Sequence, residues 1–200
     1  AYLHSPYIQS LKEDIKSGII GDVEFVDTAF FTQYYVEDIR MYKELGGGAM
    51  YDLGCYCTTM ILSLIDSEPA TVKAVAEMNE HGADLYTAAM LKFENGVRAA
   101  FNVGMILGKN TNDRMDRLYI RGSKGCIKSS VEYNQAGELT YTVVVDGKEI
   151  TKKVMVRQNY ALELERMNKA IEGKEAILVT PEFSIKNAKL IDEVLEQIEY

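Results

Sequence analysis

A long series of short, strand-like segments in the middle of the chain constrains the fold more than any other feature of the sequence. Segments rich in β-branched and aromatic residues are predicted to be strands at residues 23–33, 70–78, 86–93, 97–106, 117–121, 126–129, 139–145 and 148–154. Asn95-Gly96 and Asp146-Gly147 each separate two of these segments, and such dipeptides readily take the positive φ of a tight hairpin turn. Neighbouring strands are therefore expected to pair antiparallel.

Helical segments lie on both sides of this series and are predicted at residues 6–17, 49–65, 159–172 and 181–199. Gly18 and Gly173 follow the first and third of them, as is common at helix ends. Thr180 followed by Pro181 is typical of a helix start. Strands in a run with helices towards both ends favour an α+β fold, in which a large, open, mostly antiparallel or mixed sheet has helices packed on one face.

The composition excludes several classes of protein. The chain has 200 residues, 47% of them apolar, which suits one substantial core. Its net charge of −8 would repel a phosphate backbone, so we expect no nucleic acid partner. No apolar stretch approaches the roughly 18 residues that a membrane span needs, so no membrane partner is expected. Because there are three prolines and no low-complexity tract, residues 1–200 are expected to form a single domain.

The cysteines argue against disulfide and metal sites. Cys55, Cys57 and Cys126 are too few for a disulfide framework, which indicates a reducing, cytoplasmic compartment. Cys55 and Cys57 are spaced too closely for a usual zinc site, and the chain holds two histidines. These cysteines are therefore expected to be small buried helix residues.

The segment from residue 44 to residue 57 is the one best suited to chemistry. Gly46-Gly47-Gly48 is predicted to leave N–H groups uncovered at a helix start, where the dipole favours polar or negative ligand groups. Asp52 and Tyr56 are four residues apart, so both side chains are expected on one helix face. Gly54, which lies between them, is expected to let another segment or a ligand approach closely. A carboxylate beside a phenol can exchange protons, but a phenol with its ordinary pKa of about 10 needs a nearby cation to do so near neutrality.

The same pair also has a purely structural interpretation. An aspartate in a first helical turn often only satisfies the helix dipole, and a tyrosine in an apolar helix is usually a core residue. The spacing of Asp52 and Tyr56 does not by itself decide between the two interpretations.

Residues 46–56, Gly-Gly-Gly-Ala-Met-Tyr-Asp-Leu-Gly-Cys-Tyr, resemble the hallmark motif of the glucose–fructose oxidoreductase, inositol dehydrogenase and MocA (Gfo/Idh/MocA) family. Further stretches are similar to that family in the same order, namely residues 15–23, 38–40, 93–96 and 120–127. The resemblance therefore covers nearly the whole chain.

This resemblance implies the family's C-terminal domain, a dihydrodipicolinate-reductase-like domain whose sheet packs helices on one face and a second subunit on the other. Members bind NAD or NADP in an N-terminal Rossmann domain and transfer a hydride to or from a CH–OH carbon. That domain is absent from these residues, since no Gly-x-Gly-x-x-Gly follows a strand. The family's Rossmann domain also carries a Glu-Lys-Pro motif, whose lysine would be the cation beside Tyr56 and is likewise absent from these residues. Many members have histidine in place of this tyrosine, so the chain looks like the subset similar to dihydrodiol and xylose dehydrogenases.

The resemblance also implies roles for individual residues. Tyr56 would exchange the substrate's proton, and Asp52 would position the substrate. Arg40 is a further candidate, either holding a substrate hydroxyl or carboxylate or bracing the glycine turn by bonding to its carbonyls. His4 is either a substrate ligand or a surface histidine, and together with Ser5 it stands where much of the family has a Tyr-Arg pair.

The leading hypothesis is the substrate-binding and oligomerisation domain of an NAD(P)-dependent oxidoreductase that acts on a sugar, polyol or diol. By itself the domain is expected to be inactive and to bind no cofactor. The alternative is a non-catalytic dimerisation or ligand-sensing module of the same fold. A third and weaker hypothesis is an unrelated α+β ligand-binding domain. A homodimer or a higher homo-oligomer through the outer sheet face is expected, because residues 70–106 carry apolar side chains too densely to alternate cleanly.

Overall fold

The strands form one mixed sheet in the order β2-β3-β4-β1-β5-β6-β7-β8. The computed structural model describes residues 1–130, 133 and 135–200. The strands are β1 (Val23–Tyr34), β2 (Pro69–Met78), β3 (Asp84–Phe93), β4 (Arg98–Lys109), β5 (Arg114–Gly122), β6 (Gly125–Ser129), β7 (Gly137–Val145) and β8 (Lys148–Val156). Both predicted hairpins form, β3–β4 around Asn95-Gly96 and β7–β8 around Asp146-Gly147. The α+β fold with a mostly antiparallel, mixed sheet is therefore confirmed.

The position of β1 makes the sheet mixed. This strand lies between β4 and β5 and runs parallel to β4 but antiparallel to β5. Its middle residues Ala29, Phe30 and Phe31 are all buried although their side chains alternate between the two faces. Strand β1 is thus the centre of the sheet and carries packed side chains on both faces.

The described residues contain four α-helices and four shorter helical turns. The α-helices are α1 (Pro6–Lys16), α2 (Cys55–Leu64), α3 (Asn159–Ile171) and α4 (Pro181–Gln197). The turns are η1 (Tyr2–His4), η2 (Ile39–Met41), η3 (Lys43–Leu45) and η4 (Met50–Gly54), the last being π-helical. The predicted start of the last helix is confirmed, since the Thr180 side chain accepts from the Phe183 N–H and Pro181 is the first helical residue. The helix predicted at 49–65 is instead a π-helical turn followed by a shorter α-helix.

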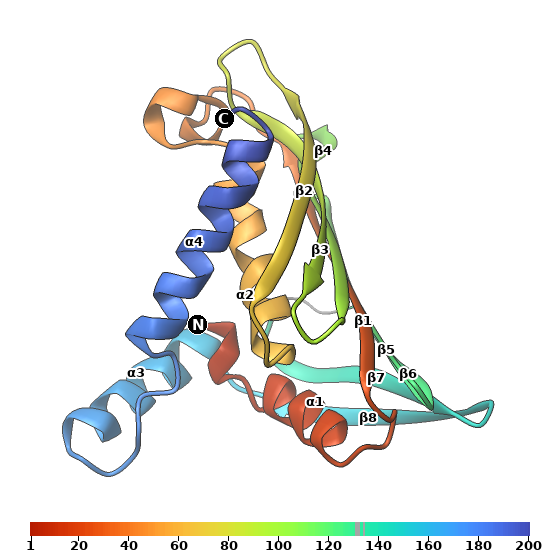
Figure 1. Cartoon of the computed structure of the whole chain (residues 1–200). Coiled ribbons are helices and arrows are strands. Elements are labelled where there is room, and N and C mark those ends of the chain that lie inside the picture. The colour runs from red at the N-terminus through yellow and green to blue at the C-terminus, as the bar shows by residue number, and fades with distance from the viewer. Residues whose placement is uncertain (131–132, 134) are drawn as a thin grey trace.

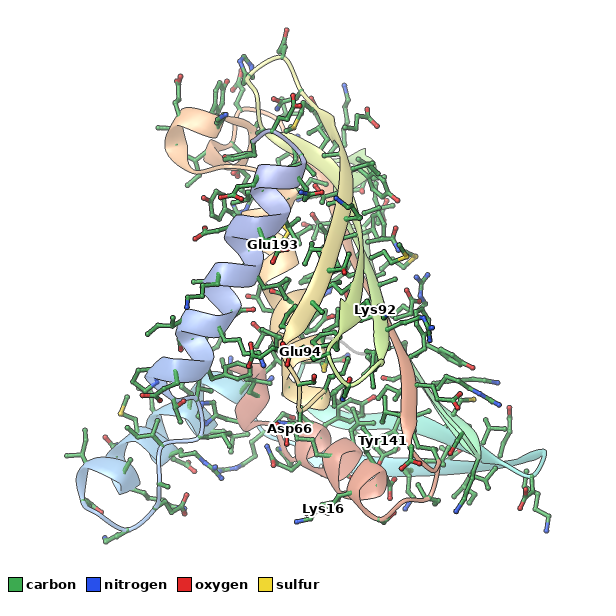
Figure 2. The ribbon with its side chains drawn as sticks, viewed as in Figure 1. Lys16, Asp66, Lys92, Glu94, Tyr141 and Glu193 are labelled. Carbon is green, nitrogen blue, oxygen red and sulfur yellow. The ribbon has the colours of Figure 1, made fainter. Side chains whose placement is uncertain are left out.

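The α-helices lie on one side of the sheet, as Figure 1 shows. Helix α4 packs on β2, α2 packs on β1 and β4, and α1 packs on β8. The core between these helices and the sheet includes Leu11, Met60, Phe101 and Val194, none of which is exposed to solvent. At the other end of the sheet, Tyr141 of β7 lies against α1 (Figure 2) and its hydroxyl shares a hydrogen bond with the Ser10 hydroxyl. The prediction that helices pack on one face is confirmed.

The opposite face of the sheet carries no helix in the described part of the chain. On β3, Leu91 and Phe93 are buried, whereas Met90 and Lys92, which alternate with them, are exposed. Lys92 marks this open face in Figure 2. More and less exposed residues alternate along β2 and the second half of β3, whereas Val103, Gly104 and Met105 of β4 are buried in succession. The open face still exposes large apolar side chains, with Val75 67% and Met90 62% exposed. No helix in the described residues is long and apolar enough to cross a membrane.

Candidate active site

The glycine run forms a turn that packs directly against the segment before it. Gly46 and Gly48 have φ values of 72° and 107°, which glycine adopts without steric cost. The N–H of Gly47 donates to the carbonyl of Tyr42 at 2.9 Å, and that of Gly48 donates to the carbonyl of Arg40 at 2.8 Å. The prediction that these N–H groups are uncovered is therefore wrong, because they donate hydrogen bonds to backbone carbonyls of this chain.

The helix that follows starts with the π-helical turn η4, an irregularity that is frequent at functional sites. The N–H of Met50 at its start donates to Oδ2 of Asp84, on β3, at 2.9 Å. A Cβ on Gly54 would lie 2.4 Å from Sδ of Met50. The space at Gly54 thus holds the side chain of its own helix, and the expectation that another segment or a ligand approaches there is wrong.

Asp52 and Arg40 form an ion pair at the edge of this turn. Nε of Arg40 lies 3.0 Å from Oδ2 of Asp52, without the alignment of a good hydrogen bond, and Nη1 lies 3.1 Å from Oδ1 of Asp38. Burial lowers the pKa of the Arg40 guanidinium, but the negative charges of Asp52 and Asp38 and the polar contacts with both carboxylates outweigh it and raise that pKa. The Arg40 and Asp52 side chains are 39% and 30% exposed, so the pair contributes at most about 1 kcal/mol to stability and stays accessible to a ligand.

The structure refines both interpretations of Arg40. Its backbone carbonyl, rather than its guanidinium, braces the glycine turn. Its side chain, together with Asp52, lines a cavity of about 190 Å³ whose other described walls are Ile39, Leu45, Gly46, Gly47 and Tyr51.

Tyr56 lies in a group of aromatic rings. Its ring centroid is 5.9 Å from that of Tyr2, 5.5 Å from that of Phe30 and 5.4 Å from that of Tyr133. The Tyr2 hydroxyl also donates to the Tyr56 carbonyl at 2.9 Å. These contacts hold the ring from several sides, and Tyr56 remains only half-buried.

A cavity of about 370 Å³ opens beside Tyr56. Its described walls are Ala1, Tyr2, Leu3, Cys55, Tyr56, Thr59, Tyr160, Glu163 and Val179. The side chains of these residues include one carboxylate and neither lysine nor arginine, so no side chain of the described walls supplies the cation that a reactive phenol needs. Among the described residues, the cavity has no wall in common with that of Arg40 and Asp52. A ligand that touches both Asp52 and Tyr56 would have to extend from one opening to the other.

His4 lies in a third cavity, of about 200 Å³, between the start of the chain and α3. This cavity shares Glu163 and Val179 with that of Tyr56. Burial lowers the pKa of His4, and its Nδ1 is buried without a hydrogen-bond partner among the described residues. The structure therefore places His4 next to the tyrosine cavity and away from Arg40 and Asp52.

The two cysteines of the helix are unreactive by environment. Burial raises the pKa of the Cys57 thiol to about 12 and that of Cys55 to about 11. Both thiols are thus protonated near neutral pH, and the thiolate is the form that binds metals and attacks electrophiles. In the part of the chain that the structure describes, no group of three or more His, Cys, Asp or Glu residues is placed to hold a metal ion.

The sequence profile of the GFO/IDH/MocA C-terminal domain matches residues 8–128, a range that contains the glycine turn, Arg40, Asp52 and Tyr56. The chain belongs to the GFO/IDH/MocA family. A trans-1,2-dihydrobenzene-1,2-diol dehydrogenase from Xenopus laevis is 29% identical and matches 96% of this chain and 59% of its own length. A D-xylose 1-dehydrogenase (NADP+) from Haloferax volcanii is 24% identical and matches 82% of the chain and 49% of its own length. These relatives confirm the predicted GFO/IDH/MocA subset, and the chain spans about three fifths of the length of the first of them.

Solved structures of oxidoreductases share this GFO/IDH/MocA fold. A 3-ketoreductase from Actinomadura kijaniata, in complex with NADP and TDP-benzene, superposes with a TM-score of 0.88 at 20% identity over 98% of this chain and 60% of its own. An aldose-aldose oxidoreductase from Caulobacter crescentus, complexed with glycerol, has a TM-score of 0.84 at 16% identity over 99% and 60% of the two chains. At these identities the likeness establishes the fold alone.

The sequence did not indicate a role for Asp84, whose carboxylate accepts a hydrogen bond from the Met50 N–H at the start of the turn that leads into α2. It lies 34 positions after Met50, at the start of a strand, and is completely buried. An aspartate next to an apolar strand was the available signal, but nothing local connects it to the glycine turn.

Proposed function

We propose that residues 1–200 are the substrate-binding and oligomerisation domain of an NAD(P)-dependent oxidoreductase that acts on a CH–OH group of a sugar, polyol or diol. The placement of Tyr56 carries the proposal. Its ring lies in the wall of a cavity of about 370 Å³, directly after the glycine-opened turn that bears Asp52. A cavity of that size suits a small ligand. The names of the dihydrodiol and xylose dehydrogenases support the substrate class.

The phenol of Tyr56 is proposed to exchange a proton with the reacting hydroxyl. When the substrate is oxidised, its hydroxyl proton passes to the phenolate oxygen of Tyr56 while the carbon loses a hydride, and in the reduction the neutral phenol returns that proton as the carbon gains a hydride. Packing against Tyr2, Phe30 and Tyr133 limits the orientations of the ring. A fixed orientation places the hydroxyl at one point of the cavity, which is the condition for efficient proton transfer.

Asp52 and Arg40 are proposed to bind the substrate. The carboxylate of Asp52 accepts hydrogen bonds from substrate hydroxyls, and the ion pair with Arg40 holds that carboxylate at the cavity edge. Both side chains are partly exposed and can be reached from solvent. His4 is proposed to contact only a substrate long enough to pass Glu163, which lines both neighbouring cavities.

The residues of this chain fit a substrate better than a dinucleotide. Phosphates bind to free N–H groups at a helix start, but here the carbonyls of Tyr42 and Arg40 and the carboxylate of Asp84 take these donors. We therefore propose that NAD or NADP binds to a Rossmann domain outside residues 1–200 of a longer protein. The nicotinamide, when bound, accepts or donates the hydride. The NADP complex of the 3-ketoreductase supports this assignment, as does the greater length of the relatives.

A homodimer through the open sheet face is part of the proposal. Val75 and Met90 are exposed there, and Phe31 stacks on Tyr86 at 6.0 Å between ring centroids. Exposed apolar groups on a sheet face often mark a protein interface. The same face favours the second candidate function, a non-catalytic dimerisation or ligand-sensing module, which differs from the first in having no use for the Tyr56 hydroxyl.

The experiment that separates the two candidates is a turnover assay of the longer protein with NAD and NADP against a panel of diols, polyols and aldoses. Tyr56→Phe is expected to lower kcat by roughly 10²–10⁴-fold, the usual contribution of a general acid–base group. Tyr34→Phe is the matched control, because Tyr34 lies at the end of β1 with Lys109 over its ring and lines neither proposed cavity. A wild-type protein with no turnover would favour the non-catalytic module, whereas a Tyr56→Phe variant with normal kcat would show that the Tyr56 hydroxyl takes no part in the reaction.

A further inference from the structure

We propose that Asp84 is a positioning residue of the candidate active site, whose buried carboxylate fixes the start of the helix that carries Asp52 and Tyr56. This inference rests on the proposed function, because it assigns a role within the same site. It concerns a residue outside the glycine motif, on a different element of the fold.

Asp84 places a carboxylate at a fully buried position, where a charged group is unusual. The residue is the first of β3 and is completely buried. A buried carboxylate is costly unless hydrogen bonds compensate for the lost water. Its Oδ2 accepts from the Met50 N–H at 2.9 Å and from the Thr87 hydroxyl at 2.5 Å. The N–H of Met50 is one of the donors that a helix start leaves without a partner in its own helix, and Asp84 supplies that partner from across the fold.

The second oxygen of Asp84 lies directly against the glycine turn. A Cβ on Gly48 would lie only 2.1 Å from Oδ1, and Gly48 also has a φ of 107°, so its position suits glycine for two reasons. Oδ1 has no well-formed hydrogen bond among the described residues. The Ala49 N–H also acts to lower the pKa of this carboxyl. The carboxylate therefore lies in contact with the three residues at the start of the helix, Gly48, Ala49 and Met50.

Two backbone hydrogen bonds connect this contact to the site residues. The N–H of Gly48 donates to the carbonyl of Arg40 at 2.8 Å, and the carbonyl of Gly48 accepts from the N–H of Asp52 at 3.1 Å. A shift of Gly48 therefore moves both members of the Arg40–Asp52 pair. Tyr56 is one turn further along the same helix. The described walls of the two cavities do not include Asp84, so it acts through the turn and does not touch the substrate.

The test replaces Asp84 and follows both geometry and turnover. In residues 1–200, Asp84→Ala is expected to shift the NMR resonance of the Arg40 Nε–H group and to accelerate hydrogen exchange of the Met50 amide. In the longer protein it is expected to lower kcat/KM by roughly 10²-fold, the cost of a small misplacement of reacting groups. Asp84→Asn keeps an acceptor for the Met50 N–H and is expected to restore much of both readouts. Asp66→Asn is the control, because Asp66 is exposed just beyond the other end of the helix.

The outcomes distinguish this inference from the proposed function. If the wild-type protein has no turnover, the proposed function fails, and the Arg40 resonance still decides whether Asp84 positions the pair. An unchanged Arg40 resonance in Asp84→Ala, with circular dichroism showing a folded protein, overturns the inference. If Asp84→Ala does not fold, Thr87→Val provides the same test, because it removes only the hydroxyl that donates to Oδ2. A Thr87→Val variant with a shifted Arg40 resonance and lower kcat/KM supports positioning, and one with neither change overturns it.

Discussion

The buried carboxyl of Asp84 makes the stability of the protein depend on pH in an unusual direction. Burial raises its pKa from the ordinary value of 3.8 to about 6, although hydrogen bonds from Thr87 and Met50 act to lower it. An acid with a higher pKa in the folded state binds more protons when folded than when unfolded, over the interval between the two pKa values. The free energy of unfolding contributed by Asp84 therefore falls as pH rises from about 4 to about 6 and is constant above.

The size of the effect follows from the shift. The difference between 6 and 3.8 is about 2 pKa units, and at about 1.4 kcal/mol per unit the wild type loses up to about 3 kcal/mol across this interval. Asp84→Asn cannot ionise and should lack this term. Groups with a lowered pKa, such as Asp38, whose carboxylate accepts the Arg40 N–H, make stability fall as pH falls. They are present in both proteins, so they cancel in the comparison.

The assay is urea denaturation of the wild type and Asp84→Asn at several pH values between about 4 and about 7, followed by circular dichroism. The difference in unfolding free energy should change in favour of the variant as pH rises, by up to about 3 kcal/mol, and then level off. Asp66→Asn should follow the wild type at every pH. Parallel curves for the wild type and Asp84→Asn would refute the argument, since they would mean that Asp84 has the same pKa in the folded and unfolded states.

Three further predictions concern the site and the open face. Asp52→Asn in the longer protein should raise KM and lower kcat, because the substrate loses a charged acceptor, and an unchanged KM in steady-state kinetics would count against that role. Met90→Asp should convert a dimer of residues 1–200 into monomers by light scattering, because it places a charge in the proposed apolar interface, and a wild type that is already monomeric at high micromolar concentration would contradict the dimer. Residues 1–200 alone should show no turnover with NAD or NADP and no tight binding of either by calorimetry, since the donors of the glycine turn are bonded within the chain. Sub-micromolar binding of either cofactor would show that the assignment to another domain is wrong.

The local features of this protein followed from the sequence. Asn95-Gly96 and Asp146-Gly147 predicted two hairpins, and Thr180-Pro181 predicted the start of α4, because turn and cap residues determine backbone conformation within a few residues of themselves. The glycine run and the residues around it indicated the family and the candidate site for the same reason, since a motif is a local pattern. The α+β class followed from the order of the elements alone.

Only the tertiary structure decided how distant segments meet. It placed β1 between β4 and β5, and it joined Asp84 to Met50. It also showed that Asp52 and Tyr56 line separate cavities. The glycine turn illustrates the limit, because its N–H groups look free in the sequence and are bonded in the fold. Local periodicity reports which residues are apolar and how the chain turns, whereas the partner of a buried polar group depends on side chains brought together by packing. Those contacts have no local signature, so the residue that fixes the start of the site helix became visible only in the folded chain.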